Sequence, residues 1–142
     1  MQPQWNAGDI LVELYEQLVE HSLIQPTFVR DYPEAAKPLA KRHRSIPGLG
    51  EAYDLVVNGV ELVTAFSELN DPVVQRERLV AQSLLAAQGN EDAMDLDENF
   101  LRALEFAMPP AGGMGMGIDR LVMLLWGVGI RESILFPMLR PE

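Results

Sequence analysis

The sequence predicts an α+β domain with an antiparallel sheet flanked by helices. Apolar residues recur at helical spacing over residues 9–23, which indicates an amphipathic helix. Two strand-like runs, 53–57 and 60–64, flank Asn58-Gly59, a pair favoured in two-residue hairpin turns because both positions need positive φ. Further helices and a glycine-rich strand follow in an order that favours an antiparallel sheet.

The first helix is expected because its apolar and polar side chains separate onto opposite faces. The apolar positions are Ile10, Leu11, Leu14, Tyr15, Leu18 and Val19. The other face carries Glu13, Glu16, Gln17 and Glu20. Residues 24–47 contain four prolines, so we expect irregular backbone there, with one short strand at 27–29.

The second half of the chain predicts three more helices. Asp71 as the cap and Pro72 at the first helical position begin one that ends near Ala87. Another is expected over 97–107, ended by two prolines, and a third over 118–126, ended by a glycine. The residues expected to face inward from the middle one are Phe100, Leu101 and Leu104. The apolar tail at 134–137 is expected to pack on the core.

Composition limits the classes of function. With 142 residues, 48% of them hydrophobic, the chain can build the core of a single domain over 1–142. The net charge of −10, with two lysines among eleven basic residues, argues against a nucleic-acid-binding module by itself. The basic run 41–44 is interpreted either as a solvated loop that offsets nearby acids or as a phosphate contact.

The location of the protein is expected to be cytoplasmic. There is no cysteine, which excludes disulfides and thiolate metal sites and fits a cytosolic protein. No stretch approaches the ~20 apolar residues that span a bilayer, and the first residues do not resemble a secretory signal. His21 and His43 have no partner at metal-ligand spacing, so we expect structural roles for them and no zinc site.

The predicted hairpin brings two acids together. With a turn at Asn58-Gly59, Val56 would pair with Glu61 and Asp54 with Val63. Asp54 and Glu61 then share one face as diagonal neighbours, roughly 7–8 Å apart at the backbone. Such a pair can hold magnesium with nucleotide phosphates completing its shell, or it can be an acidic solvent face.

A third acid joins them under one condition. Glu68 lies seven residues after Glu61, so in a regular strand the two side chains would face opposite ways. A β-bulge between Leu62 and Phe66 is required if both acids serve one site.

The run 113–120 (GMGMGIDR) is the third candidate feature. Alternating glycines remove side chains from one face of an extended segment, so a flat ligand can approach the backbone. Arg120 can then place a planar guanidinium on an aromatic ring or a phosphate. The spacing differs from the Rossmann and Walker A patterns, and close helix–sheet packing would also explain the glycines.

Several segments in this order resemble the last part of the class II lysyl-tRNA synthetase catalytic domain. Residues 23–33 (LIQPTFVRDYP) and 38–43 (PLAKRH) resemble the stretch after that family's central insertion. Residues 66–72 (FSELNDP) resemble its amino-acid-binding strand, and 113–120 resemble its third class-defining motif. The end, 131–141 (RESILFPMLRP), also matches, and 80–89 resembles the actinobacterial branch.

The resemblance implies roles for the acids. Asp54 and Glu61 would hold Mg²⁺ on ATP, and Glu68 would face the substrate lysine, with Phe66 and Thr64 beside it. Two positions depart from the family: Asp54 stands where glutamate is usual, and Thr64 stands where an asparagine often contacts the substrate. The resemblance thus supports ATP binding more strongly than lysine recognition.

The resemblance also implies the nucleotide site and the reaction. Gly113, Gly115 and Gly117 would line the ATP pocket, while Arg120 would stack on adenine and contact the γ-phosphate. Arg120 and Glu61 would be the catalytic residues. The lysine carboxylate would attack the α-phosphate, giving lysyl-adenylate and pyrophosphate, and the lysyl group would pass to tRNA. Positioning and charge stabilisation suffice for such chemistry.

Three functions are carried forward. The leading one is a partial lysine–tRNA ligase, because the first two class motifs and the anticodon-binding domain are not found, and we expect little or no aminoacylation by this chain alone. A paralogue that lysylates another acceptor and a non-catalytic nucleotide-, amino-acid- or partner-binding module are the alternatives. An apolar surface left by the missing half would favour self-association or pairing with a synthetase subunit.

Overall fold

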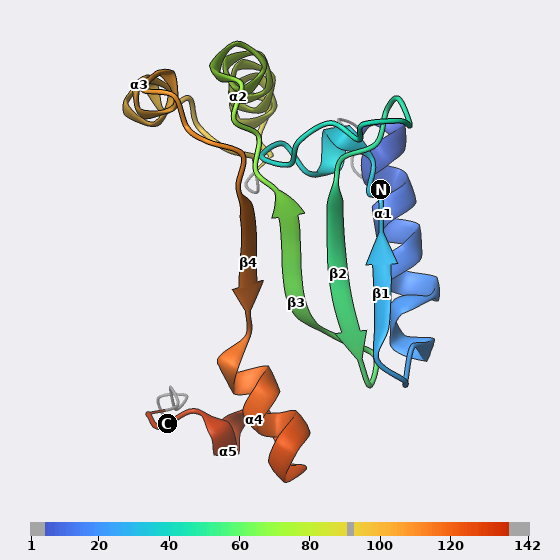
Figure 1. Cartoon of the computed structure of the whole chain (residues 1–142). Helices are drawn as coiled ribbons and strands as arrows, with labels where there is room; N and C mark the ends of the chain where they lie inside the picture. The colour runs from blue at the N-terminus through green and yellow to red at the C-terminus, as the bar shows by residue number, and fades with distance from the viewer. Residues whose placement is uncertain (1–4, 91–92, 137–142) are drawn as a thin grey trace.

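The computed structural model describes residues 5–90 and 93–136, and these form a four-stranded antiparallel sheet in the order β1-β2-β3-β4 (Figure 1). The strands are β1 (Thr27–Arg30), β2 (Ala52–Val57), β3 (Val60–Ser67) and β4 (Gly112–Met116). The α-helices are α1 (Ala7–Leu18), α2 (Pro72–Ala87), α3 (Glu98–Glu105), α4 (Ile118–Trp126) and α5 (Ile130–Ser133). Short 3₁₀ helices cover Glu20–Ser22 and Glu34–Ala36. The predicted α+β class is confirmed.

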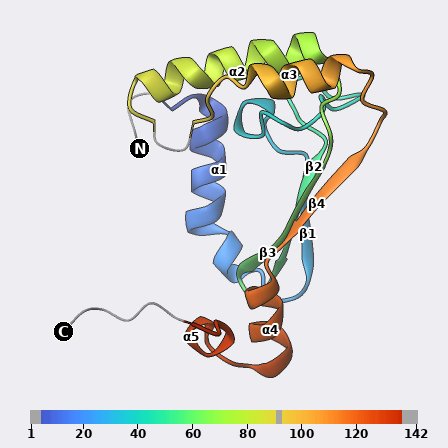
Figure 2. The same ribbon diagram turned by 90° about the vertical axis from the view of Figure 1, so that its left-hand side faces the viewer.

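The helices surround the sheet on three sides. α2 and α3 lie across one end, and α4 and α5 extend beyond the other (Figures 1 and 2). α1 runs along the sheet near β1, on one face, and leaves the β3–β4 part of that face uncovered (Figures 1 and 2). One face of the sheet is therefore bordered by α1 beside β1 and open beside β3 and β4.

α1 spans Ala7–Leu18, so the helix expected over 9–23 begins two residues earlier and gives way to the 3₁₀ helix Glu20–Ser22. A capping box forms its start. The Asn6 side chain accepts hydrogen bonds from the backbone of Gly8 and Asp9, and the Asp9 carboxylate accepts one from Asn6 N. Val12 packs against the small core around Tyr32. The predicted apolar face of α1 is only partly covered, because the sheet beside the helix is narrow. No residue of α1 is fully buried. The apolar positions left exposed are Leu11, Leu14, Leu18 and the adjoining Val19.

The predicted hairpin joins β2 to β3. Asn58 and Gly59 both have positive φ, 55° and 73°, as this turn requires. Their backbone N–H groups donate to Ile24 O and Leu23 O, each at 2.9 Å. A Cβ on Gly59 would lie 2.8 Å from the His21 carbonyl oxygen, so glycine is needed at this close approach. The contact involves the His21 backbone, and the His21 side chain is exposed.

A β-bulge interrupts the hairpin. Val56 pairs with Glu61, but Leu55 pairs with Val63, so Leu62 is an extra residue on β3. Asp54 therefore pairs with Thr64 rather than with Val63, and that part of the predicted register is wrong by one residue. The bulge itself is the feature that the third acid required.

α2 and α3 pack against each other through a small core. Asp71 and Asp97 cap the two helices by accepting backbone N–H hydrogen bonds. Leu79, Leu101 and Leu104 are buried between them. Phe100, which was predicted to face inward, is 39% exposed, because the short eight-residue helix buries only one narrow stripe.

α4 spans Ile118–Trp126, as predicted, and ends at Gly127 with a left-handed φ of 66°. Leu121 packs under the sheet, while much of the rest of α4 remains exposed. The tail was predicted to pack on the core, but Leu135 and Phe136 are about nine-tenths exposed, at 88% and 90%. Residue 137 lies outside the described residues. Within the described part of the chain, no helix has the length and apolar character needed to cross a bilayer.

Candidate ligand-binding face of the sheet

One face of β2, β3 and β4 gathers the acids and the glycines. Asp54 lies beside Thr64, which lies beside Gly115, and Phe66 lies beside Gly113. Because of the bulge at Leu62, Glu61 also joins this face. We call it the glycine face. It is made by Asp54, Glu61, Thr64, Phe66, Glu68, Gly113 and Gly115.

The required bulge is thus confirmed, and the glycines have the predicted effect. Met114 and Met116 alternate with the glycines and lie on the opposite face, next to Ala65 and Val63. On the glycine face, β4 therefore presents bare backbone beside Thr64 and Phe66. A ligand can approach that backbone closely.

Gly113 makes room for Glu68. A Cβ at position 113 would overlap the Glu68 carboxylate, whereas one at Gly115 would meet the Thr64 methyl at an ordinary 3.7 Å. The Glu68 backbone N–H donates to Ala111 O at 2.9 Å, which fixes the acid beside β4. The third acid is therefore held over the glycine strand.

Asp54 is buried, with 5% of its surface exposed, and is already partnered. The Thr64 hydroxyl donates to Asp54 Oδ1 at 2.6 Å. The Lys37 ammonium lies 3.3 Å from Asp54 Oδ2 and 3.5 Å from Oδ1. Burial and the nearby Asp54 carboxylate raise the pKa of Tyr32 above its ordinary value.

Glu61 and Arg120 meet at the end of the glycine face. Arg120 Nη1 donates to the Glu61 carbonyl oxygen and lies 3.8 Å from Glu61 Oε1. Both side chains are more than a third exposed, so this weak pair leaves them free to contact a ligand. The Arg120 side chain passes over Gly117, where a Cβ would lie 3.1 Å from Arg120 Cδ. The structure thus brings Arg120, Gly117 and Glu61 together.

The acids fit magnesium unequally. Glu61 presents a partly exposed carboxylate, a suitable oxygen ligand. Asp54 does not fit as a free ligand, since its oxygens bind Thr64 and Lys37. Over residues 5–90 and 93–136, no three His, Cys, Asp or Glu side chains are grouped to hold a metal. In this structure Glu61 is therefore an open acid and Asp54 an occupied one.

Sequence reasoning missed several residues of this site. Burial first, and then Glu13, raises the pKa of Glu16; burial and Glu16 likewise raise the pKa of Glu20. Glu16 lies in α1 and Glu20 in the following 3₁₀ helix Glu20–Ser22, and both were assigned to the solvent face of the predicted helix, yet both interact electrostatically with Asp54 and Glu61. Lys37 was also missed. The available signal was the scarcity of lysine, because Lys37 is one of only two lysines in the chain.

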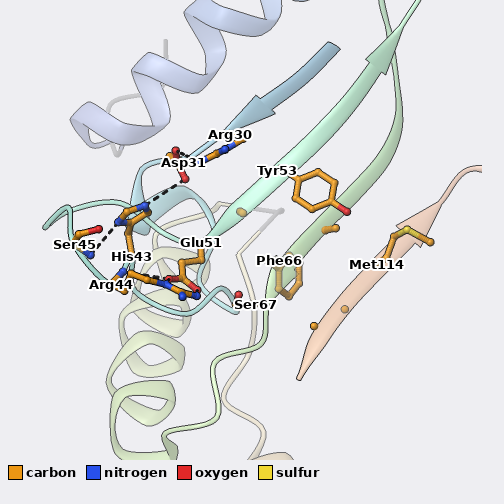
Figure 3. A pocket seen from close by; sticks show the side chains of 14 residues that line it. Arg30, Asp31, His43, Arg44, Ser45, Glu51, Tyr53, Phe66, Ser67 and Met114 are labelled. Atoms are coloured by element: carbon orange, nitrogen blue, oxygen red, sulfur yellow. Dashed lines mark hydrogen bonds and ion pairs between the residues drawn. The ribbon is translucent and has the colours of Figure 1, made fainter. Parts of the chain in front are cut away.

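A large cavity lies away from the acids of the glycine face. It has a volume of about 740 Å³ and is open to solvent near the Arg30–Asp31 corner (Figure 3). Tyr53 and Met114 lie on the face opposite Asp54, next to Ala65, and they line one side of it. Phe66 and Gly113 from the predicted site also contribute to its lining.

The charges of this cavity are paired with one another. Arg44 binds Glu51 at 2.6 Å, and His43 Nε2 lies 3.6 Å from Asp31 Oδ1 (Figure 3). His43 Nδ1 accepts hydrogen bonds from the backbone of Ser45 and Ile46. Outside the cavity, Arg42 binds the acid Glu34 at 2.7 Å. The basic run 41–44 thus contains arginines that offset nearby acids, which agrees with the solvated-loop interpretation.

The antiparallel sheet, the bulged hairpin and the glycine strand followed by Arg120 define a class II tRNA synthetase domain. The chain belongs to the family described as "tRNA synthetases class II (D, K and N)", which it matches over residues 10–140.

Curated relatives narrow the comparison. The chain is 58% identical over 98% of its length to the "Lysylphosphatidylglycerol biosynthesis bifunctional protein LysX" of Gordonia bronchialis. Proteins with the same description in Mycobacterium leprae and Mycobacterium ulcerans are 58% and 59% identical over 99% and 98% of the chain. The chain spans 12%, 12% and 13% of the lengths of these three relatives.

Proposed function

We propose that this chain forms the part of a lysine-activating site that holds the lysine ammonium and the adenine side of ATP. The observation that carries the proposal is the glycine face, where Glu68 is held over Gly113 at one end and Arg120 meets Glu61 at the other. A carboxylate and a guanidinium at opposite ends of a bare strand suit a cationic amino acid and an anionic nucleotide.

The proposed reaction is lysyl-adenylate formation. A carboxylate oxygen of lysine forms a bond to the α-phosphorus of ATP, and the bond to the departing pyrophosphate breaks. Glu68 orients the lysine, and Arg120 binds adenine and the terminal phosphate. Magnesium arrives with ATP, and Glu61 is the carboxylate open to it. These residues act by positioning charge around the reacting phosphate.

Equilibrium calorimetry of the 142-residue chain tests this proposal. We expect Glu68→Gln to weaken lysine binding roughly tenfold or more, because a hydrogen bond between charged groups is lost, while ATP–Mg binding stays. Arg120→Ala should weaken ATP–Mg binding and leave lysine binding. Glu105→Gln, an exposed acid on α3, is the matched control and should change neither affinity. A wild-type chain that binds neither ligand would refute the proposal.

The acceptor of the lysyl group is a second question. The LysX relatives are described as acting in lysylphosphatidylglycerol biosynthesis. This description favours a lipid, rather than tRNA alone, as the final acceptor of the lysyl group. We propose that lysine activated with this chain ends on phosphatidylglycerol. Replacing Glu68 by Gln in the chromosomal gene should then lower lysylphosphatidylglycerol in lipid extracts. Unchanged lipid with reduced lysyl-tRNA would instead support a tRNA acceptor.

A non-catalytic binding module remains the alternative. It predicts that the chain binds ATP or lysine and that no protein containing it catalyses lysine-dependent exchange of pyrophosphate into ATP. Exchange that depends on Glu68 would exclude it.

A further inference from the structure

We propose that Lys37 is a built-in cation that occupies the Asp54 carboxylate, so that Asp54 is not a ligand of a divalent metal in this protein. The inference deepens the proposed ATP site, on which it rests, by leaving Glu61 as the carboxylate for the metal of ATP. Lys37 is then a positioning residue that limits how many cations this face takes up.

Both oxygens of Asp54 are engaged. Lys37 Nζ lies 3.3 Å from Oδ2, and Thr64 Oγ1 donates to Oδ1 at 2.6 Å. The Asp54 side chain is 6% exposed, so water reaches it poorly. A divalent ion at Asp54 would have to displace the ammonium, because two cations cannot share one buried carboxylate without strong repulsion.

The ammonium of Lys37 is held in place from other sides as well. Its Nζ lies 4.5 Å from the centre of the Tyr32 ring, in cation–π contact. Its backbone follows the 3₁₀ helix Glu34–Ala36, and Lys37 O accepts the Ala40 N–H at 3.0 Å. The side chain is 22% exposed. Lys37 is therefore built into the wall of the site rather than resting on its surface.

Charge explains why a cation is needed there. Glu16 of α1, Glu20 of the 3₁₀ helix that follows it and Glu61 of β3 act electrostatically on one another or on Asp54. The chain carries a net charge of −10 and has two lysines. One of them lies against Asp54, whereas Lys41 binds the neutral side-chain oxygen of Asn70 at 3.0 Å. A lysine at position 37 neutralises the buried acid without any ion from solution.

Manganese binding to the 142-residue chain without nucleotide tests the inference. Electron paramagnetic resonance counts the free Mn²⁺. We expect Asp54→Asn to leave the affinity of the wild type for Mn²⁺ unchanged, and Glu61→Gln to weaken it. Lys37→Met keeps the length of the side chain but removes the charge, and should bind Mn²⁺ about tenfold more tightly, a difference of about 1.4 kcal/mol.

Three controls define this result. Lys41→Met removes the same charge away from Asp54 and should show no gain. Lys37→Arg keeps the cation and should also show no gain. The double variant Lys37→Met with Asp54→Asn should lose the gain that Lys37→Met produces. A loss of Mn²⁺ affinity in Asp54→Asn, or no gain in Lys37→Met, would overturn the inference.

A measurement on the wild type keeps the test valid if Lys37→Met does not fold. With ¹⁵N-labelled lysine, the chain gives two ammonium signals, and Lys41→Arg assigns them. The Lys37 signal should keep its position as Mg²⁺ or Mg²⁺–ATP is added to saturation. Displacement of that signal would show that metal takes Asp54 and would overturn the inference. Since Mn²⁺ and Mg²⁺ alone are probes, this result is independent of whether ATP and lysine bind as proposed.

Discussion

Asp54 and Thr64 depart together from the residues that the resemblance leads one to expect, and the structure places them in direct contact. Thr64 Oγ1 donates to Asp54 Oδ1, and Lys37 completes the cluster. The shorter acid is thus held inside the sheet by the shorter polar partner. Taken separately, Asp54 and Thr64 each weaken the resemblance to the synthetase family. In the structure they form a single local arrangement.

A glycine-to-alanine pair tests the floor of the glycine face. Gly113→Ala must displace the Glu68 carboxylate, so we expect a loss of folding stability of about 1–3 kcal/mol and weaker lysine binding. Gly115→Ala adds the same methyl to the same strand at an ordinary contact distance and should change stability by less than about 1 kcal/mol. Urea unfolding of both variants provides the comparison, and equal losses would contradict the placement of Glu68.

Glu51 predicts a pH dependence of stability. Hydrogen bonds from Arg44 and then Ser67 lower the pKa of Glu51 from 4.5 to about 2. Because the folded-state pKa is lowered, the stabilisation is fully present above pH 4.5 and is lost as the pH falls through about 2. Thermal unfolding measured at steps between pH 6 and pH 2 should show that Glu51→Gln loses less stability on acidification than the wild type. Parallel curves for wild type and variant would exclude this role.

At the scale of elements, local sequence signals predicted most boundaries well, the end of α1 at Leu18 rather than residue 23 being an exception, and they predicted the facing of side chains less well. The Asn58-Gly59 turn, the Asp71 cap and the end of α4 at Gly127 follow from backbone preferences of one or two residues. The place of the bulge at Leu62 depends on the packing of both flanking strands, so only its need could be predicted. The exposed side of α1 depends on the narrow sheet beside it, which no local pattern encodes.

Two arginines of α2 provide a matched test of how that helix is anchored. Arg78 donates to Pro38 O and Ala40 O and binds Glu34 at 2.6 Å, and its side chain is 11% exposed. Arg78→Leu removes the hydrogen bonds to Pro38 O and Ala40 O and leaves Glu34 with Arg42 alone. Because these carbonyl groups lose a buried donor, we expect it to lower the free energy of unfolding by about 1–3 kcal/mol.

Arg76→Leu is the control for that measurement. Arg76 binds Glu98 at 2.6 Å in solvent, where ion pairs contribute little, so urea unfolding should change little. If replacing either arginine lowers the free energy of unfolding by the same amount, the buried network of Arg78 does not anchor α2.

At the scale of the molecule, α4 carries an apolar surface that nothing in the described residues covers. Ile118, Leu125 and Trp126 are each more than three-fifths exposed. We propose that this surface drives self-association of the chain. Sedimentation velocity should show a mass that rises with concentration, and Leu125→Glu should reduce it. A monomer at all concentrations would contradict the proposal.

The candidate site was predictable to the extent that it depends on backbone alternation. Glu61 and Glu68 were expected on one face only if a bulge lay between Leu62 and Phe66, and the bulge at Leu62 brings them there. The glycines were expected to bare one face of their strand, but strand period alone did not predict that this is the face of the acids. Lys37 was not predictable, because it comes from a proline-rich loop whose path is set by tertiary contacts such as that with Tyr32. The residues that supply charge from α1 and the loop therefore had to be found in the structure.

The most direct measurement of the central claim is a nuclear magnetic resonance titration of the chain with lysine and with ATP–Mg. We expect lysine to shift the amides of Glu68 and Gly113, and ATP–Mg to shift those of Gly117 and Arg120, on and beside the glycine face. Shifts confined to residues of the cavity that lie off the glycine face, such as Arg44 and Tyr53, or no shifts at all, would contradict it.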